Sequence, residues 1–179
     1  MALSPSSEPT YPGIDVSGYQ GNIDYSRVAK AGIKIVYMKS SEGNSYVDSR
    51  FERNYTEAKK NGLKVGVYHF LTATNVRDAE DQARFFASII SGKQIDCKLA
   101  MDYESFQGAS VEMINAISNA FLNKVRELTG KETIIYSDIY NAQNRFDKEL
   151  AGNYPLWLAY YGDYNNTEDI DVRWSKWTG

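Results

Sequence analysis

Two acidic residues stand two positions apart in Asp102-Tyr103-Glu104, directly after the apolar run Leu99-Ala100-Met101. Side chains two apart on a strand point to the same side, so both carboxyls should face one space, roughly 6–7 Å apart at the backbone. Two acids held this close repel each other, so one should keep its proton near neutral pH. Cleavage of a glycosidic bond needs a proton donor beside a carboxylate. This short motif therefore points to glycoside chemistry.

The sequence holds few of the residues that other common kinds of catalytic site require. His69 is the single histidine and Cys97 the single cysteine. A His- or Cys-rich zinc site needs three or four ligands, and an intrachain disulfide needs a second cysteine. No phosphate-binding glycine loop is present, and Cys97 reads as a structural thiol. We therefore expect no metal and no cofactor, with carboxylates and tyrosines as the chemical tools.

Apolar, β-branched stretches alternate with helical stretches along the chain. Such alternation implies parallel strands joined by right-handed crossovers. An open doubly wound sheet and a closed barrel both fit, and the missing phosphate loop after the first strand favours a barrel. The expected strands are 13–17, 33–39, 63–70, 98–102, 133–137 and 156–160, and the expected helices are 24–31, 48–61, 77–90, 110–128 and 141–146.

Polar residues follow several of these strands. In either architecture the functional site lies at the carboxyl ends of the strands, so acids placed there would converge. Strand-end acids can also cap the helices that follow them. We prefer the capping role for Asp138 and leave both roles open for Glu42. The residues at these places are Asp15, Ser17, Glu42, His69, Asp102, Glu104 and Asp138.

Net charge and composition limit the classes of partner that we expect the protein to bind. The net charge is −3 with no block of Lys or Arg, which argues against nucleic acid or an anionic membrane as the main partner. No stretch approaches the roughly 20 apolar residues of a membrane span. The chain holds 14 tyrosines, whose amphipathic rings suit sugar binding but also pack at the edge of a core.

Five segments of the chain, in order, resemble motifs of the family-25 glycoside hydrolases, the Chalaropsis-type lysozymes found as phage endolysins and bacterial autolysins. The resemblance covers nearly all of residues 11–179. The matching segments are Gly13–Ser17, Lys39–Gly43, Gly66–Phe70, Ala100–Glu104 and Pro155–Gly162.

The resemblance implies an irregular TIM-like (β/α)5(β)3 barrel. It also implies hydrolysis of the β-1,4 bond between N-acetylmuramic acid and N-acetylglucosamine in bacterial peptidoglycan. Glu104 would be the general acid/base, Asp102 would orient the 2-acetamido group of the substrate, and Asp15 would be a third acid. The expected substrate-binding residues are Tyr68, Tyr136, Trp157, Tyr161, Glu42 and His69.

The two ends of the chain raise further expectations. Residues 1–10 read as a flexible leader without a signal-peptide pattern, which suggests cytoplasmic accumulation with release at lysis, or non-classical export. Residues 11–179 form the expected catalytic domain. Family members usually continue beyond a segment like Trp177-Thr178-Gly179, so the domain should lack its last strand and any wall-binding module. The resulting open sheet edge offers a route to self-association.

Two other functions remain open at the level of sequence. A chitinase-like hydrolase of N-acetylglucosamine polymers would use the same acid pair. A non-catalytic glycan-binding fragment would keep the groove without the reaction, although the retained Asp102 and Glu104 argue against it.

Overall fold

The computed structural model describes residues 11–161, 174 and 177–178; the leader expected at 1–10 lies outside them. The strands are β1 (Gly13–Val16), β2 (Ile35–Glu42), β3 (Tyr46–Val47), β4 (Lys64–Phe70), β5 (Leu99–Asp102), β6 (Thr133–Asp138), β7 (Leu156–Ala159) and β8 (Trp177–Thr178). The helices are η1 (Gly18–Gln20), α1 (Tyr25–Lys30), α2 (Phe51–Lys60), α3 (Val76–Ile89), α4 (Val111–Thr129), α5 (Ile139–Asn144) and α6 (Lys148–Asn153).

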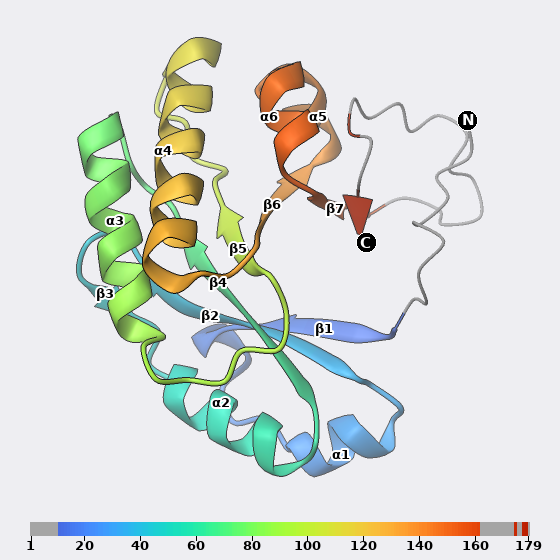
Figure 1. Ribbon diagram of the computed structural model, residues 1–179. Coiled ribbons are helices and arrows are strands. Elements are labelled where there is room, and N and C mark those ends of the chain that lie inside the picture. The colour runs from blue at the N-terminus through green and yellow to red at the C-terminus, as the bar shows by residue number, and fades with distance from the viewer. Residues whose placement is uncertain (1–10, 162–173, 175–176, 179) are drawn as a thin grey trace.

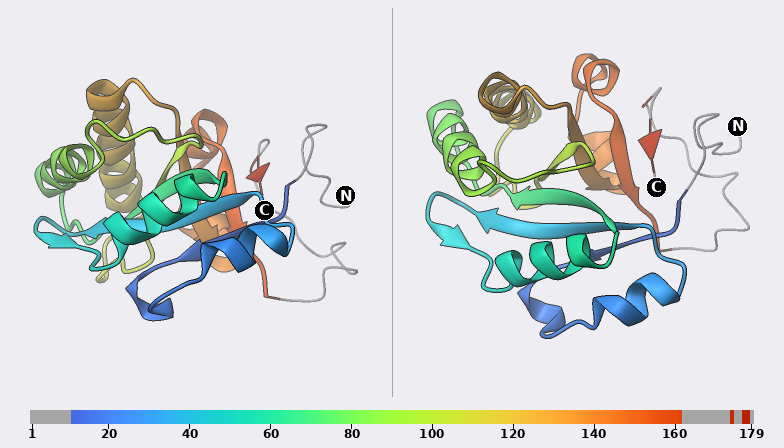
Figure 2. Two further views of the ribbon diagram at one scale, coloured as in Figure 1. Left: turned by 90° about the horizontal axis from the view of Figure 1, so that it is seen from below. Right: turned by 60° about the horizontal axis from the view of Figure 1, so that its bottom comes forward.

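The strands form one sheet in the order β1-β2-β4-β5-β6-β7-β8, and every neighbouring pair in this order is parallel. The short β3 pairs with β2 in the antiparallel sense. The sheet curls into a half-barrel with helices on its outer side, and α3 and α4 run side by side (Figures 1 and 2). The expected α/β class with parallel crossovers is therefore confirmed, as a half-barrel whose strand order ends at β1 and β8.

Alternate side chains along each strand face either the helices or the concave side of the sheet. In β2, Val36 and Met38 are fully buried against the helices, whereas Ile35, Tyr37 and Lys39 are partly exposed on the concave side. The helices supply the other half of the core through one apolar face each. Among the largest fully buried side chains are Phe51 of α2, Phe86 of α3, and Ile114, Ile117 and Phe121 of α4.

Local sequence signals explain most of the helix ends. Asn75 and Ser110 cap α3 and α4 with their side chains, and Gly130 takes the left-handed conformation that ends α4. Asp138 caps α5 by accepting a hydrogen bond from the Asn141 backbone N–H at 2.9 Å, which confirms the capping role. Four short elements, η1, β3, α6 and β8, were not predicted because two to six residues carry too little periodicity.

Tyr37 crosses the concave side of the sheet and packs directly on Gly66. Its hydroxyl donates to the Lys98 carbonyl at 3.0 Å, and its ring centroid lies 4.7 Å from that of Trp157. A Cβ atom on Gly66 would lie 2.5 Å from the Tyr37 ring. Glycine is therefore required at this position by the close approach of the ring.

Replacing Gly66 with alanine should destabilise the fold by about 1–3 kcal/mol, because Tyr37 is held on its other sides and must shift. The measurement is the free energy of unfolding in urea. Gly152→Ala is the matched control, since a Cβ there meets no atom within 4 Å and lies in α6. Equal stability of the two variants would contradict this view of Tyr37.

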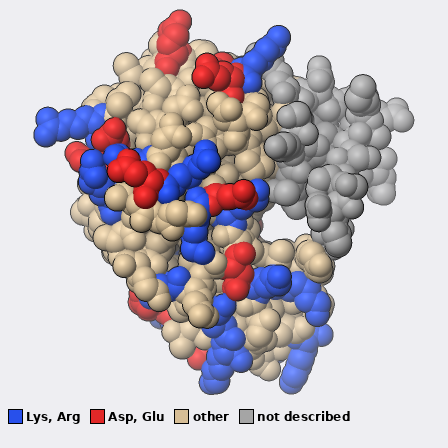
Figure 3. Space-filling model, in the orientation of Figure 1, with Lys and Arg blue, Asp and Glu red and all other residues tan. Residues whose placement is uncertain are grey.

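Acidic and basic side chains are both spread over the face seen in Figure 3. Among the residues that the structure describes, no helix has the length and apolar character needed to span a membrane.

Candidate active site

Asp102 lies at the carboxyl end of β5, in the middle of the sheet, paired with Phe70 of β4 and Tyr136 of β6. Its side chain is only 8% exposed. The next residue, Tyr103, points the other way, is fully buried, and donates a hydrogen bond to the Ala73 carbonyl at 3.1 Å. Asp102 and the exposed Glu104 share a hydrogen bond, as alternate residues on one side of a strand end should be able to do.

Burial and the neighbouring Glu104 charge raise the pKa of Asp102 to about 8, so the pair of acids holds one proton near neutral pH. The hydrogen bond with Glu104 acts in the same direction, and the Lys39 ammonium partly opposes it. The Oδ1 atom of Asp102 is buried and has no hydrogen-bond partner among the described residues. The pair can therefore donate one proton, and Asp102 Oδ1 can accept one more hydrogen bond.

Tyr68 marks where the acids from separate strands converge. It lies on β4 beside Asp102, and burial raises its pKa far above the usual value. The charges of Asp102, Asp15, Asp48 and Glu104 raise it further, in that order. Asp15 of β1 is thus close enough to Tyr68 and Asp102 for its charge to raise the pKa of both.

Asp48 was not among the predicted site residues. It is 4% exposed and accepts hydrogen bonds from the backbone N–H groups of Gly18 at 2.8 Å and Arg50 at 2.9 Å. It therefore ties the turn after β1 to the turn before α2. Its position before a helical stretch suggested only a helix start.

Lys39 is the second residue that sequence reasoning missed. Its Nζ lies 2.6 Å from Glu42 Oε2, 4.8 Å from the centroid of the Phe70 ring and 5.7 Å from that of Tyr46. Its charge also reaches Asp102, whose pKa it lowers. Glu42, for which two roles were open, thus lies on the concave side as the partner of Lys39.

Three of the predicted aromatic residues of the groove, Tyr136, Trp157 and Tyr161, form a continuous group on the concave side. The ring centroids of Trp157 and Tyr136 are 5.0 Å apart in an edge-to-face arrangement. Tyr136 in turn shares a hydrogen bond with Tyr161 and senses the charges of Glu104 and Asp102. Tyr161 is 90% exposed, so this aromatic wall extends from the acids to solvent.

His69 lies on the other side of the sheet. It is fully buried, with Nδ1 2.9 Å from Ser41 Oγ and Nε2 3.3 Å from Gln82 Oε1. Its ring packs against Phe86 and Phe121, with centroids 5.5 and 5.2 Å away. The structure therefore places His69 on the helix-facing side of the sheet, opposite the acids.

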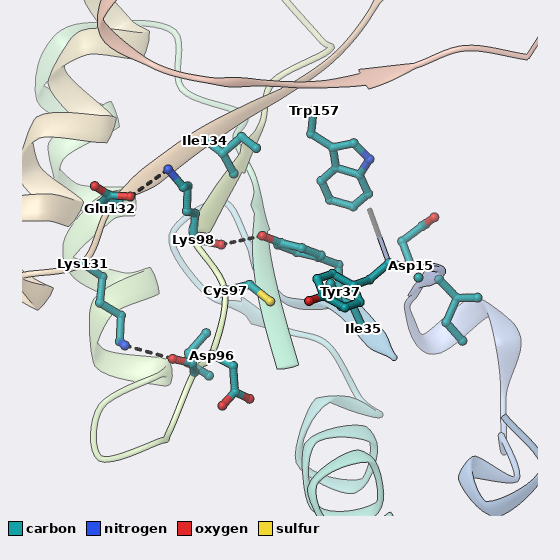
Figure 4. A pocket seen from close by; sticks show the side chains of 14 residues that line it. Asp15, Ile35, Tyr37, Asp96, Cys97, Lys98, Lys131, Glu132, Ile134 and Trp157 are labelled. Atoms are coloured by element: carbon teal, nitrogen blue, oxygen red, sulfur yellow. Dashed lines mark hydrogen bonds and ion pairs between the residues drawn. The ribbon is translucent and has the colours of Figure 1, made fainter. Parts of the chain in front are cut away.

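A cavity of about 630 Å³ opens on the concave side, nearer the amino ends of the strands than the acid pair. Figure 4 shows Asp15 and Trp157 at its edge, with Tyr37 between them and the Cys97 segment. Its basic side chains already have partners: Lys98 pairs with Glu132 at 2.7 Å, and Lys131 donates to the Ile95 carbonyl at 3.0 Å. We therefore place the chemistry at Asp102 and not in this cavity.

Exposed tyrosines surround the same edge of the sheet. Tyr19 is 97% exposed in η1, directly after β1, and Tyr46 is half-exposed in β3, directly after β2. Tyr140 and Tyr161 are exposed after β6 and β7. All four therefore follow carboxyl ends of strands, where the acids also lie. Exposed aromatic rings around an acid pair suit a polymer with apolar sugar faces.

The geometry supports proton transfer to a bound molecule and hydrogen bonding to one of its N–H or O–H groups. Within residues 11–161 and the three further described positions, no group of three or more His, Cys, Asp or Glu side chains is arranged to hold a metal ion.

Comparison with known proteins gives a consistent result. The model of the glycosyl hydrolases family 25 matches residues 14–179. The autolytic lysozyme of Clostridium acetobutylicum is 34% identical over 150 residues, which cover 84% of this chain and 45% of that protein. Lysozyme M1 of Streptomyces globisporus is 31% identical over 171 residues, which cover 89% of this chain and 58% of that protein.

The solved structure of a muramidase from Acremonium alcalophilum superimposes with a TM-score of 0.82 at 28% identity, covering 94% of this chain and 85% of that one. This chain spans about half the length of the two lysozymes compared above. The family model nevertheless covers almost all of it. The chain belongs to glycosyl hydrolase family 25.

Proposed function

We propose that this chain is a lysozyme-type muramidase that hydrolyses the β-1,4 bond between N-acetylmuramic acid and N-acetylglucosamine in bacterial peptidoglycan. The observation that carries the proposal is the buried Asp102 beside the exposed Glu104 at the carboxyl end of β5, where burial and the Glu104 charge raise the pKa of Asp102. The names of the relatives, an autolytic lysozyme and a muramidase, support the same substrate. Peptidoglycan strands are then the partner and the cell wall the place of action.

In the proposed reaction Glu104 gives a proton to the leaving oxygen. Asp102 meets the 2-acetamido N–H of the substrate with its unpaired Oδ1 atom. That contact favours the carboxylate form of Asp102, and its proton passes along the shared hydrogen bond to Glu104. The acetamido oxygen attacks the anomeric carbon as the glycosidic bond breaks and the leaving oxygen takes the Glu104 proton. The Glu104 carboxylate then takes a proton from water, which attacks the anomeric carbon and reopens the ring, so that the pair again holds one proton.

This substrate-assisted route predicts net retention of the anomeric configuration. The β-anomer should appear first, with N-acetylmuramic acid at the new reducing end, and thiazoline mimics of the bicyclic intermediate should inhibit. Proton NMR before mutarotation reads the first anomer. Initial release of the α-anomer would instead assign Asp15 as the base that activates water on the opposite face.

Digestion of purified cell walls, followed by mass spectrometry of the fragments, tests the function itself. Muropeptides ending in reducing N-acetylmuramic acid are expected. Fragments ending in N-acetylglucosamine, or digestion of chitin alone, would support the chitinase-like alternative, and binding without cleavage would support a non-catalytic module.

The remaining finer expectations belong to the same proposal. We take the half-barrel as part of a (β/α)5(β)3 barrel, with Tyr68, Tyr136, Trp157 and Tyr161 lining the substrate groove together with Glu42. His69 is left out of the groove because of its burial. Self-association through a sheet edge stays a prediction.

A further inference from the structure

β2 carries one residue more than β4 near the carboxyl edge. Lys39 pairs with Tyr68 and Ser41 pairs with His69, so Ser40 has no partner in the ladder. Ser40 and Ser41 are both fully buried, although neighbours on a regular strand face opposite sides. The extra residue forms a β-bulge, which is rare between parallel strands and over-represented next to active sites.

The bulge decides on which side of the sheet Glu42, the ion-pair partner of Lys39, lies. Lys39 and Glu42 are three residues apart, a spacing that puts two side chains on opposite faces of a regular strand. Here both lie on the concave side, 2.6 Å apart at Nζ and Oε2, and Lys39 reaches Asp102. A straight β2 of the same sequence would turn Glu42 toward the helices.

Buried hydrogen bonds hold the bulge from the helix side. Gln82 Oε1 accepts the Thr72 backbone N–H at 3.0 Å, so this oxygen also accepts the Nε2–H of His69. The Nδ1 atom of His69 is then free to accept the Ser41 hydroxyl at 2.9 Å. Ser40 adds a hydrogen bond from its own hydroxyl to the Tyr68 carbonyl at 3.1 Å.

The imidazole stays in one protonation state over the working range. Burial lowers the pKa of His69 to about 4, so the ring is neutral at neutral pH. Phe86 of α3 and Phe121 of α4 pack against the ring. His69 therefore connects the rigid helix layer to the bulge without titrating itself.

We propose that His69 is a positioning residue, which anchors Ser41 to Gln82 and so fixes the β2 bulge that keeps Glu42 on the concave side, where Glu42 holds the Lys39 ammonium within reach of Asp102. Its value for catalysis rests on the proposed muramidase function. The geometric part of the proposal does not, because the effect of Lys39 on Asp102 exists in the free protein.

The test follows the pKa of Asp102 by carboxyl ¹³C NMR in the wild type, His69→Phe and Lys39→Met. The charges that act on Asp102 are those of Glu104 in its own segment, Lys39 of β2 and Asp15 of β1. Two further titratable groups, Tyr68 and Tyr136, face Asp102 from the adjacent strands. Loss or displacement of the Lys39 charge should raise the pKa of Asp102 by about half a unit or more. Both single variants should shift it in this direction, and the double variant should shift it no further than Lys39→Met.

Two further variants separate positioning from stability. His69→Phe leaves the buried Ser41 hydroxyl without its acceptor, and His69→Phe with Ser41→Ala removes that cost while leaving the bulge unanchored. Ser118→Ala is the matched control, because this buried hydroxyl donates to Ile114 in α4 at 2.7 Å, away from the bulge. It should lower the melting temperature and leave Asp102 unchanged.

The proposal would be overturned if the pKa of Asp102 in the variant carrying both His69→Phe and Ser41→Ala equalled that of the wild type. It would also be overturned if the pKa shifts caused by His69→Phe and Lys39→Met added up in the variant that carries both. If His69→Phe does not fold, Ser41→Ala alone breaks the same anchor and should give the same upward shift. Absence of wall digestion by the wild type would refute the muramidase function and leave the titration result valid. With the function intact, kcat should fall at least about tenfold in the His69 variants, with less change in KM.

Discussion

Glu104→Gln should lower kcat for wall hydrolysis by about 10³-fold and leave the protein folded. General acid–base groups contribute roughly 10²–10⁴-fold, and glutamine keeps the volume of the side chain while losing the transferable proton. Glu104 is exposed, so its replacement removes no core packing. Turbidity clearing of purified walls gives the rate, and circular dichroism reports folding.

Glu127→Gln provides the control, because this exposed acid lies near the end of α4, away from the carboxyl edge. It removes the same charge and should clear walls at the wild-type rate. Near-normal clearing by Glu104→Gln would show that another group donates the proton.

Asp102→Asn should stabilise the protein while costing most of its activity. The folded chain keeps the Asp102 proton up to about pH 8, whereas an unfolded aspartate loses it near pH 3.9. Between these values the unfolded state binds fewer protons, so the stability of the wild type falls as the pH rises. Asparagine is neutral throughout and can still donate to Glu104.

The increase in the free energy of unfolding caused by Asp102→Asn should therefore be close to zero at pH 4, grow between pH 4 and 8, and stay level above pH 8. The whole shift corresponds to a few kcal/mol, so the melting temperature at pH 8 should rise by about 6 °C or more. A gain of the same size at pH 4 would mean that asparagine stabilises by packing and not by removing a buried charge.

Much of the fold could be predicted because its local signals agree. Each predicted strand is a short apolar run, and breakers such as Gly62 and Gly130 end the helices before them. The pairing of Asp102 with Glu104 follows from alternation on one strand end. The curvature of the sheet depends on contacts between distant segments, so no local pattern could choose between a full barrel and a half-barrel.

The placement of His69 was predictable in principle. Adjacent residues on a strand face opposite sides, so once Tyr68 is assigned to the acid side, His69 must face the helices. The resemblance of the segment Gly66–Phe70 to a family motif places both residues in the groove, because a motif match does not distinguish the two faces of a strand. Lys39 is different, because alternation already puts it on the concave side, but its ion-pair partner Glu42 reaches that side only through a bulge that leaves no sequence pattern of its own.

The extra residue in β2 can be removed without changing which side chains the rest of the strand carries. Deleting Ser40 would leave Lys39, Ser41 and Glu42 opposite Tyr68, His69 and Phe70 in an uninterrupted ladder. Every remaining side chain would keep its face. The kink would be lost, together with the hydrogen bonds of the Ser40 hydroxyl to the Tyr68 carbonyl and the Ser41 hydroxyl and that from the Asp48 backbone N–H to the Ser40 carbonyl. A single codon deletion would thus straighten the wall of the groove without changing any group that lines it, a route by which related chains could acquire grooves of different curvature around the same acids.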